Sequence, residues 1–150
     1  MFALTADQLA VRYMAKSFAD ERIAPNALRW DEDEHFPLDV LREAAALGMA
    51  AIYVSEQHGG SGMARLDAAL IFEALSTGCP CIAAFLSIHN MVAWVIDGFG
   101  SEELKARYLP RLANMELIAS YCLTEPGSGS DAAALTAPAP EMNCLTPSST

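Results

Sequence analysis

The chain contains few basic residues: 9 lysines and arginines stand against 19 aspartates and glutamates, for a formal net charge of −10. Nucleic acids and anionic membrane surfaces both select basic patches, so we expect neither as a partner. A phosphate-bearing ligand is still compatible with this charge, because a local group of backbone N–H groups can bind an anion.

The chain also lacks paired cysteines. Its four cysteines (Cys79, Cys81, Cys122, Cys144) form no C-x-x-C pair and have no zinc-like spacing to the histidines. We therefore expect reduced thiols in an intracellular protein and no metal site.

No basic region followed by an apolar core opens the sequence, so no signal peptide is expected. A Ser/Arg-rich transit sequence is also missing, which favours a bacterial cytoplasmic protein. The longest apolar stretch, Cys79–Ile96, is interrupted by Ser87, His89 and Asn90. This pattern predicts a buried helix rather than a membrane span.

What the chain does have is 53% hydrophobic and 19% charged residues over 150 positions, which indicates one globular domain. Its first part shows helical spacing almost throughout, beginning with a capping box at Thr5 and Gln8. The segment 49–54 is either extended or a buried connector. Helices are predicted over about 6–22, 37–48, 66–78 and 81–98, and from Ser101 onward.

Two polar segments are interpreted as surface. The acidic run 31–34 is expected to be solvated, with a cation site as the alternative. The Gly-rich segment 57–62 is expected to be a flexible connector, because no Lys-Ser/Thr opens a helix after it as a P-loop requires. His58 is accordingly placed on a surface loop.

The predicted helix 81–98 is apolar on nearly every side, so we expect it to be buried all round at the centre of the bundle. Its polar residues Ser87, His89 and Asn90 then need hydrogen-bond partners. Bonds to neighbouring backbone are one interpretation, and the lining of a ligand pocket is the other.

Near Met115 the pattern changes to an apolar stretch, 117–123, that we interpret as a buried strand. It leads into a turn of small residues, 124–131, in which Gly127 and Gly129 carry no Cβ that would block a ligand. Successive N–H groups in such a turn favour anions. The segment is either an anion or cofactor loop or an ordinary strand-to-strand turn.

The stretch Cys122–Ala134 resembles the signature segment of the flavin-dependent acyl-CoA dehydrogenases. Three further stretches, 71–79, 87–91 and 99–103, are similar to the same family and occur in the expected order. The resemblance covers roughly residues 3–135 and is strongest to the short branched-chain members.

The resemblance implies a mainly α fold. Residues 1–115 correspond to the family's N-terminal helical-bundle domain, and 116–135 to the first strand and loop of its middle β-domain. Residues 136–150 do not resemble the family's continuation and are expected to be a disordered tail.

The resemblance further implies FAD as cofactor and the α,β-dehydrogenation of a short, branched-chain acyl-CoA, in fatty-acid or valine catabolism. It implies an electron-transfer flavoprotein as partner, a homotetramer when full-length, and the mitochondrial matrix if the source is eukaryotic. Ser130 would also approach the acyl-CoA, while Ser87 and Met91, one turn apart, would line a pocket for its acyl group. The residues implied to contact the flavin are Tyr121, Cys122, Leu123, Thr124, Gly129 and Ser130.

Glu125 and Asp131 are expected to hold the loop. In this family the proton is removed by a glutamate of the C-terminal bundle, so no catalytic residue is assigned here. We expect the chain alone to be inactive and to retain FAD weakly or not at all. Two alternatives are a non-catalytic helical interaction module and a fragment of a related flavoprotein, such as an acyl-CoA oxidase or a nitroalkane oxidase.

Overall fold

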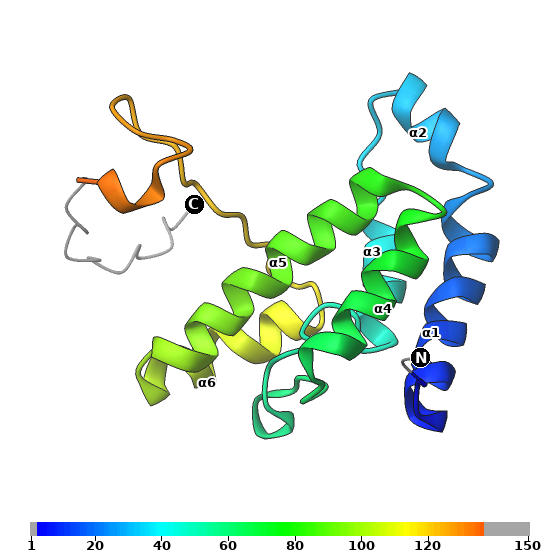
Figure 1. Cartoon of the computed structure of the whole chain (residues 1–150), viewed down its shortest axis with the longest axis horizontal. Coiled ribbons are helices and arrows are strands. Elements are labelled where there is room, and N and C mark those ends of the chain that lie inside the picture. The colour runs from blue at the N-terminus through cyan, green and yellow to red at the C-terminus, as the bar shows by residue number, and fades with distance from the viewer. Residues whose placement is uncertain (1–2, 137–150) are drawn as a thin grey trace, which may run out of the picture.

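The computed structural model describes residues 3–136, and this part of the chain is built from helices packed side by side (Figure 1). Within it no β-strand forms, so the mainly α prediction is confirmed. The elements in chain order are α1 (Ala6–Phe18), η1 (Ala19–Ile23), α2 (Ala27–Glu32), α3 (Leu38–Ala46), η2 (Glu56–His58), α4 (Arg65–Ser76), α5 (Pro80–Phe99), α6 (Glu102–Ala113) and η3 (Ala132–Ala134).

The first helix begins where the sequence predicts. The Thr5 hydroxyl accepts from the Gln8 N–H at 3.2 Å, and the Gln8 side chain accepts from the Thr5 N–H at 3.0 Å. This reciprocal pair satisfies donors that a helix N-terminus leaves open. The helical chain continues through the π-helical turn η1, which ends at Ile23.

A short helix that the sequence pattern did not predict, α2, follows Pro25. Trp30 anchors it, since its side chain is buried in the core. The acidic run that overlaps the end of α2 is exposed as expected. Within residues 3–136, no group of three or more His, Cys, Asp or Glu side chains could hold a metal ion.

Between α3 and α4 the chain forms a buried connector rather than an extended strand, which decides between the two predictions for 49–54. Met49, Ile52 and Val54 are fully buried. The Gly-rich segment after it folds back onto the connector. The Ser61 N–H donates to the Ala51 carbonyl at 3.0 Å, and the Met63 N–H donates to the Ile52 carbonyl at 2.8 Å.

Helix α5 runs along the bundle and packs against α4 and α6 (Figure 1). The prediction that it is buried on all sides is wrong. Phe99 is 78% exposed and Val95 42% exposed, because no other element of residues 3–136 covers that side. The covered side consists of Ile82, Ala83, Leu86, His89, Asn90 and Ala93.

By length and composition α5 is also the one helix in the described part that could cross a membrane. Its buried polar side chains, however, bond to backbone outside α5, as in a helix packed within a protein.

The prediction of a strand at 117–123 is also wrong. After α6 the chain is extended and leads away from the helices to the orange loop of Figure 1. An isolated bridge between Glu125 and Ser128 is its only ladder contact among the described residues. A strand needs a neighbouring strand to pair with, and residues 3–136 offer none. The predicted disordered tail lies, apart from Thr136, outside the described residues.

Candidate functional site

The open side of α5 and the extended segment after α6 line an apolar cavity of about 360 Å³ that is open to solvent. Its walls come from two places in the sequence that lie about thirty residues apart. The lining residues are Met91, Val92, Trp94, Val95, Ser120 and Tyr121.

The structure brings together two of the predicted site residues, Met91 and Tyr121, in the walls of this cavity. Ser87 is not among the lining residues. Its hydroxyl instead donates to the Ala84 carbonyl at 2.8 Å, one turn back along α5. Among residues 3–136, Ser87 therefore bonds to neighbouring backbone, as the first of the two interpretations predicts.

The other predicted flavin contacts follow Tyr121 along the extended chain. Cys122 is exposed and its thiol is free. Thr124 and Ser130 are exposed, while Leu123 and Gly129 are partly buried. The structure places these residues in one segment that begins at the cavity.

That segment ends in a compact turn. Glu125 and Ser128 exchange backbone hydrogen bonds of 2.8 and 3.2 Å. The Glu125 carboxylate accepts from the Thr136 N–H at 3.0 Å, so Glu125 holds the loop as expected. Asp131 participates through its backbone carbonyl, which accepts from the Ser128 hydroxyl.

The glycines of the turn are not required by the chain's own packing. A Cβ at Gly127 would meet nothing within 4 Å, and one at Gly129 would meet only Thr124 at an ordinary 3.5 Å. Neither glycine has a positive φ. Their missing side chains therefore leave space on the outer surface of the loop.

His89 attaches the extended segment to α5 through a hydrogen bond. Its imidazole is fully buried and forms two hydrogen bonds to backbone. Nε2 lies 3.0 Å from the Leu112 carbonyl, and Nδ1 accepts from the Ala119 N–H at 3.2 Å. Burial lowers the pKa of His89 below its usual value, and the Leu112 carbonyl opposes this only in part.

Asn90, the next residue, holds the connector that precedes the Gly-rich segment. Its side-chain oxygen accepts from the Ile52 N–H at 2.7 Å. Its side-chain nitrogen donates to the carbonyls of Met49 and Leu86, both at 2.9 Å. Ser87, His89 and Asn90, the three polar residues that interrupt the apolar stretch of α5, thus all bond to backbone.

The sequence pattern alone did not reveal the aromatic group beside the cavity. The Arg65 guanidinium lies 4.2 Å from the Tyr53 ring centroid and 4.5 Å from that of Trp94. Trp94 also meets Phe99 edge to face at 6.0 Å. The spacing of Met91, Trp94 and Val95, which places them on one side of a helix, was the signal that could have found this wall.

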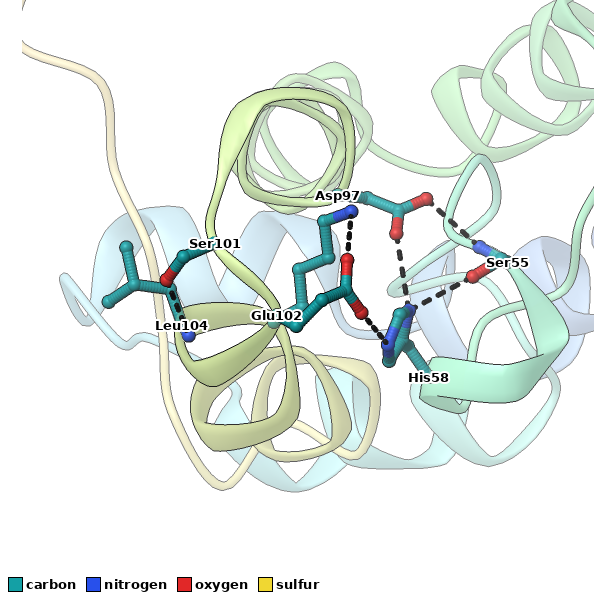
Figure 2. A network of polar contacts seen from close by, with 7 residues as sticks. Ser55, His58, Asp97, Ser101, Glu102 and Leu104 are labelled. Atoms are coloured by element: carbon teal, nitrogen blue, oxygen red, sulfur yellow. Dashed lines mark hydrogen bonds and ion pairs between the residues drawn. The ribbon is translucent and has the colours of Figure 1, made fainter.

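His58 also differs from its prediction, because it is not a freely exposed loop residue. Its side chain is 12% exposed and lies between two carboxylates, Nδ1 3.3 Å from Asp97 and Nε2 3.9 Å from Glu102 (Figure 2). The Ser55 hydroxyl lies 3.1 Å from Nδ1. This network ties η2 to the junction of α5 and α6.

The arrangement can bind and position an apolar group. His89 and Asn90 are the buried polar residues of the described part, and both His89 nitrogens are occupied by backbone. No carboxylate is buried beside the cavity within residues 3–136.

This fold and site define a class of protein: an all-α domain with an open apolar helix face, followed by a glycine-containing loop. Residues 5–116 match the family model described as "Acyl-CoA dehydrogenase, N-terminal domain". The chain belongs to this family.

Among curated proteins, the chain is 56% identical over 132 residues to the mitochondrial isobutyryl-CoA dehydrogenase of Dictyostelium discoideum and 52% identical to that of Bos taurus. Each match covers 88% of this chain and 32% of the relative. The chain thus spans about a third of the length of these relatives.

Solved structures give the same fold. Glutaryl-CoA dehydrogenase from Mycobacterium smegmatis superimposes with a TM-score of 0.82 at 30% identity, covering 89% of this chain and 35% of that one. An acyl-CoA dehydrogenase from Bacillus anthracis, solved in complex with FAD, gives 0.77 at 34% identity, covering 88% and 23%.

Proposed function

We propose that this chain forms the N-terminal part of a flavin-dependent dehydrogenase that acts on a short, branched-chain acyl-CoA. The observation that carries the proposal is the cavity lined by Met91, Trp94 and Tyr121. The chain runs on from Tyr121 into the glycine-containing loop 124–131. Membership of the family and the similarity to two isobutyryl-CoA dehydrogenases support it.

The residues present fit a flavin on chemical grounds. Tyr121, Cys122, Leu123 and Thr124 form an extended stretch along which a planar ring can lie. Gly129 and Ser130 would approach its polar parts, since the surface at Gly127 is open and Gly129 has only ordinary contacts. FAD, when bound, supplies the acceptor for the hydride that leaves the β-carbon.

The chain's own residues would bind and orient the acyl group. Met91, Trp94 and Val95 present apolar surface to a short chain, and Ser87 lies one turn before Met91 on α5. Burying the acyl chain against this surface excludes water from it and contributes about 0.8 kcal/mol per CH₂ group. Ser130 would meet the acyl-CoA from the loop.

We further propose an electron-transfer flavoprotein as the partner and a homotetramer as the assembled enzyme. One solved structure with this fold is described as an electron transferring flavoprotein of Acidaminococcus fermentans, and it superimposes with a TM-score of 0.82. The curated isobutyryl-CoA dehydrogenases are mitochondrial. A eukaryotic source would therefore place this protein in the matrix, and a bacterial one in the cytoplasm.

A domain exchange tests the proposal. Residues 1–130 would replace the matching part of the Dictyostelium discoideum isobutyryl-CoA dehydrogenase, which is 56% identical over the aligned region. We expect a yellow protein that reduces an acceptor dye with isobutyryl-CoA. A folded exchange protein that binds neither FAD nor the thioester would overturn the proposal.

The chain by itself is the second arm of that experiment. Since the described residues contribute only one wall of the proposed site, we expect a colourless preparation without dehydrogenase activity. Stoichiometric flavin in the purified chain would contradict this. In the exchange protein, Ser87→Phe should narrow the range of accepted acyl chains, and an unchanged chain-length profile would show that Ser87 does not contact the acyl group.

A further inference from the structure

We infer that His89, in its neutral form with the proton on Nε2, is the positioning residue that holds the loop-bearing segment against the helices. The inference rests on the proposed function only in that this segment carries the predicted flavin contacts. The hydrogen bonds themselves are independent of it.

The tautomer follows from the two bonds. The Ala119 N–H can only donate, so Nδ1 must present a lone pair at 3.2 Å. Nε2 faces the Leu112 carbonyl at 3.0 Å, which can only accept, so Nε2 must carry the proton. An imidazolium has two donors and no acceptor, and it would lose the bond to Ala119.

The position of Ala119 makes this bond consequential. Helix α6 ends at Ala113, and the cavity residues Ser120 and Tyr121 follow Ala119 directly. The Leu117 N–H still bonds to Arg111 at the end of α6, at 3.0 Å. Two residues further along, the Ala119 N–H bonds to His89, which attaches the segment to α5.

His89 is itself held rigidly. It is fully buried on α5 and stacks on Phe85, with ring centroids 6.2 Å apart and an interplanar angle of 27°. Its ring therefore has a fixed direction from which to accept. Losing the bond costs free energy, because the Ala119 amide is then left without this partner.

The charged groups near these contacts do not interfere. Arg111 and Glu116, which flank the α6 end of the segment, are paired with each other, with Nη2 2.7 Å from Oε1. From α3, Arg42 reaches the Met115 carbonyl at 3.5 Å. The influences on the ionisation of His89 are its burial and the Leu112 carbonyl, and burial is the larger.

Two substitutions separate the two bonds. In His89→Asn the side-chain oxygen occupies the place of Nδ1, so the bond to Ala119 can persist. In His89→Gln the amide reaches the place of Nε2, so only the bond to Leu112 can persist. We expect the protection of the Ala119 amide against hydrogen–deuterium exchange to be retained in His89→Asn. In His89→Gln, the protection factor of this amide should fall about tenfold or more.

A test on the wild-type chain avoids the risk that a substitution at His89 prevents folding. Imidazole NMR should show His89 with its proton on Nε2 at neutral pH, and the Ala119 amide should lose protection as His89 ionises, while amides of α4 remain protected. His35→Gln, which removes a different histidine, should leave this profile unchanged. A proton on Nδ1, or protection that persists after ionisation, would overturn the inference.

The exchange protein adds a readout at the cofactor. If His89 positions the segment, His89→Gln should weaken FAD binding several-fold more than His89→Asn does. Equal FAD affinities in the two variants would show that the bond to Ala119 does not affect flavin binding. The amide measurements use the chain without flavin. Failure of the exchange protein to bind FAD would therefore count against the proposed function and leave the hydrogen-bond assignment intact.

Discussion

The side-chain oxygen of Asn90 accepts a hydrogen bond from the backbone N–H of Ile52 at 2.7 Å, across 38 positions of sequence. Its nitrogen donates to Met49 at 2.9 Å, so one side chain spans the buried connector. The connector has no regular secondary structure of its own over this stretch, and Asn90 supplies partners that a helix or sheet would otherwise provide.

Replacing Asn90 by leucine should therefore destabilise the chain strongly. Leucine has a similar size but leaves the Ile52 N–H and the Met49 carbonyl buried without this partner. Each unpaired group costs about 1–3 kcal/mol, so for two groups we expect a loss of roughly 2–6 kcal/mol in the free energy of unfolding, measured by urea denaturation. The same substitution at Asn114, which is exposed, should cost much less. Equal losses would show that the Asn90 bonds contribute little.

The Gly-rich segment contains a position where a methyl group cannot fit. A Cβ at Gly60 would lie 2.1 Å from the Val54 carbonyl oxygen and 2.5 Å from its carbon. These are backbone atoms that cannot rotate away, so Gly60→Ala should shift the loop and cost about 1–3 kcal/mol, as overpacking does.

Gly98 is the matched control for that substitution. It lies in α5, where a Cβ would meet nothing within 4 Å. Alanine is the better helix former, so Gly98→Ala should stabilise the chain by about 0.5–1 kcal/mol. Thermal unfolding of the two variants should move in opposite directions, and a stable Gly60→Ala chain would mean that the loop does not pack as described.

Local signals in the sequence predicted the helices well. The Thr5 capping box depends on residues within one turn and marks the observed start of α1. The predicted helix 37–48 likewise agrees with α3, Leu38–Ala46, to within two residues. Helix α2 was missed because its six residues are held mainly through the burial of Trp30, which is a tertiary effect.

The site was harder to predict for the same reason. The glycine-containing loop is visible as composition, but the cavity needs Met91 and Tyr121, thirty residues apart, to meet. The prediction for α5 failed because an all-round apolar pattern shows what a helix can bury and not what covers it. The strand at 117–123 failed because pairing depends on a second strand.

The free energy of unfolding should depend on pH through His89. Burial lowers the pKa of the folded residue below the usual 6.5, so on acidification the unfolded chain takes up a proton before the folded chain does. The contribution of His89 to the free energy of unfolding is therefore fully present above about pH 6.5. It is lost as the pH drops below this value, with a slope of at most about 1.4 kcal/mol per pH unit.

Urea denaturation between neutral pH and the onset of carboxylate titration would measure this slope. The chain has three histidines, so variants can isolate the source. His89→Asn should flatten the profile, whereas His35→Gln should not. A profile that is the same in wild type and His89→Asn would assign the pH dependence to other groups.

The exposed apolar side of α5 should make the chain by itself bind hydrophobic dyes and associate at high concentration. Ile88 is 38% exposed, and Phe99 78%, on a helix whose other side is buried. Because contiguous apolar surface of this kind normally lies against another surface, Ile88→Lys with Phe99→Lys should reduce dye fluorescence and light scattering without changing the helical circular dichroism. Leu86→Lys is the control, since Leu86 is fully buried and a charge there should unfold the chain. Dye binding that persists in the double variant would place the dye-binding surface elsewhere on the molecule.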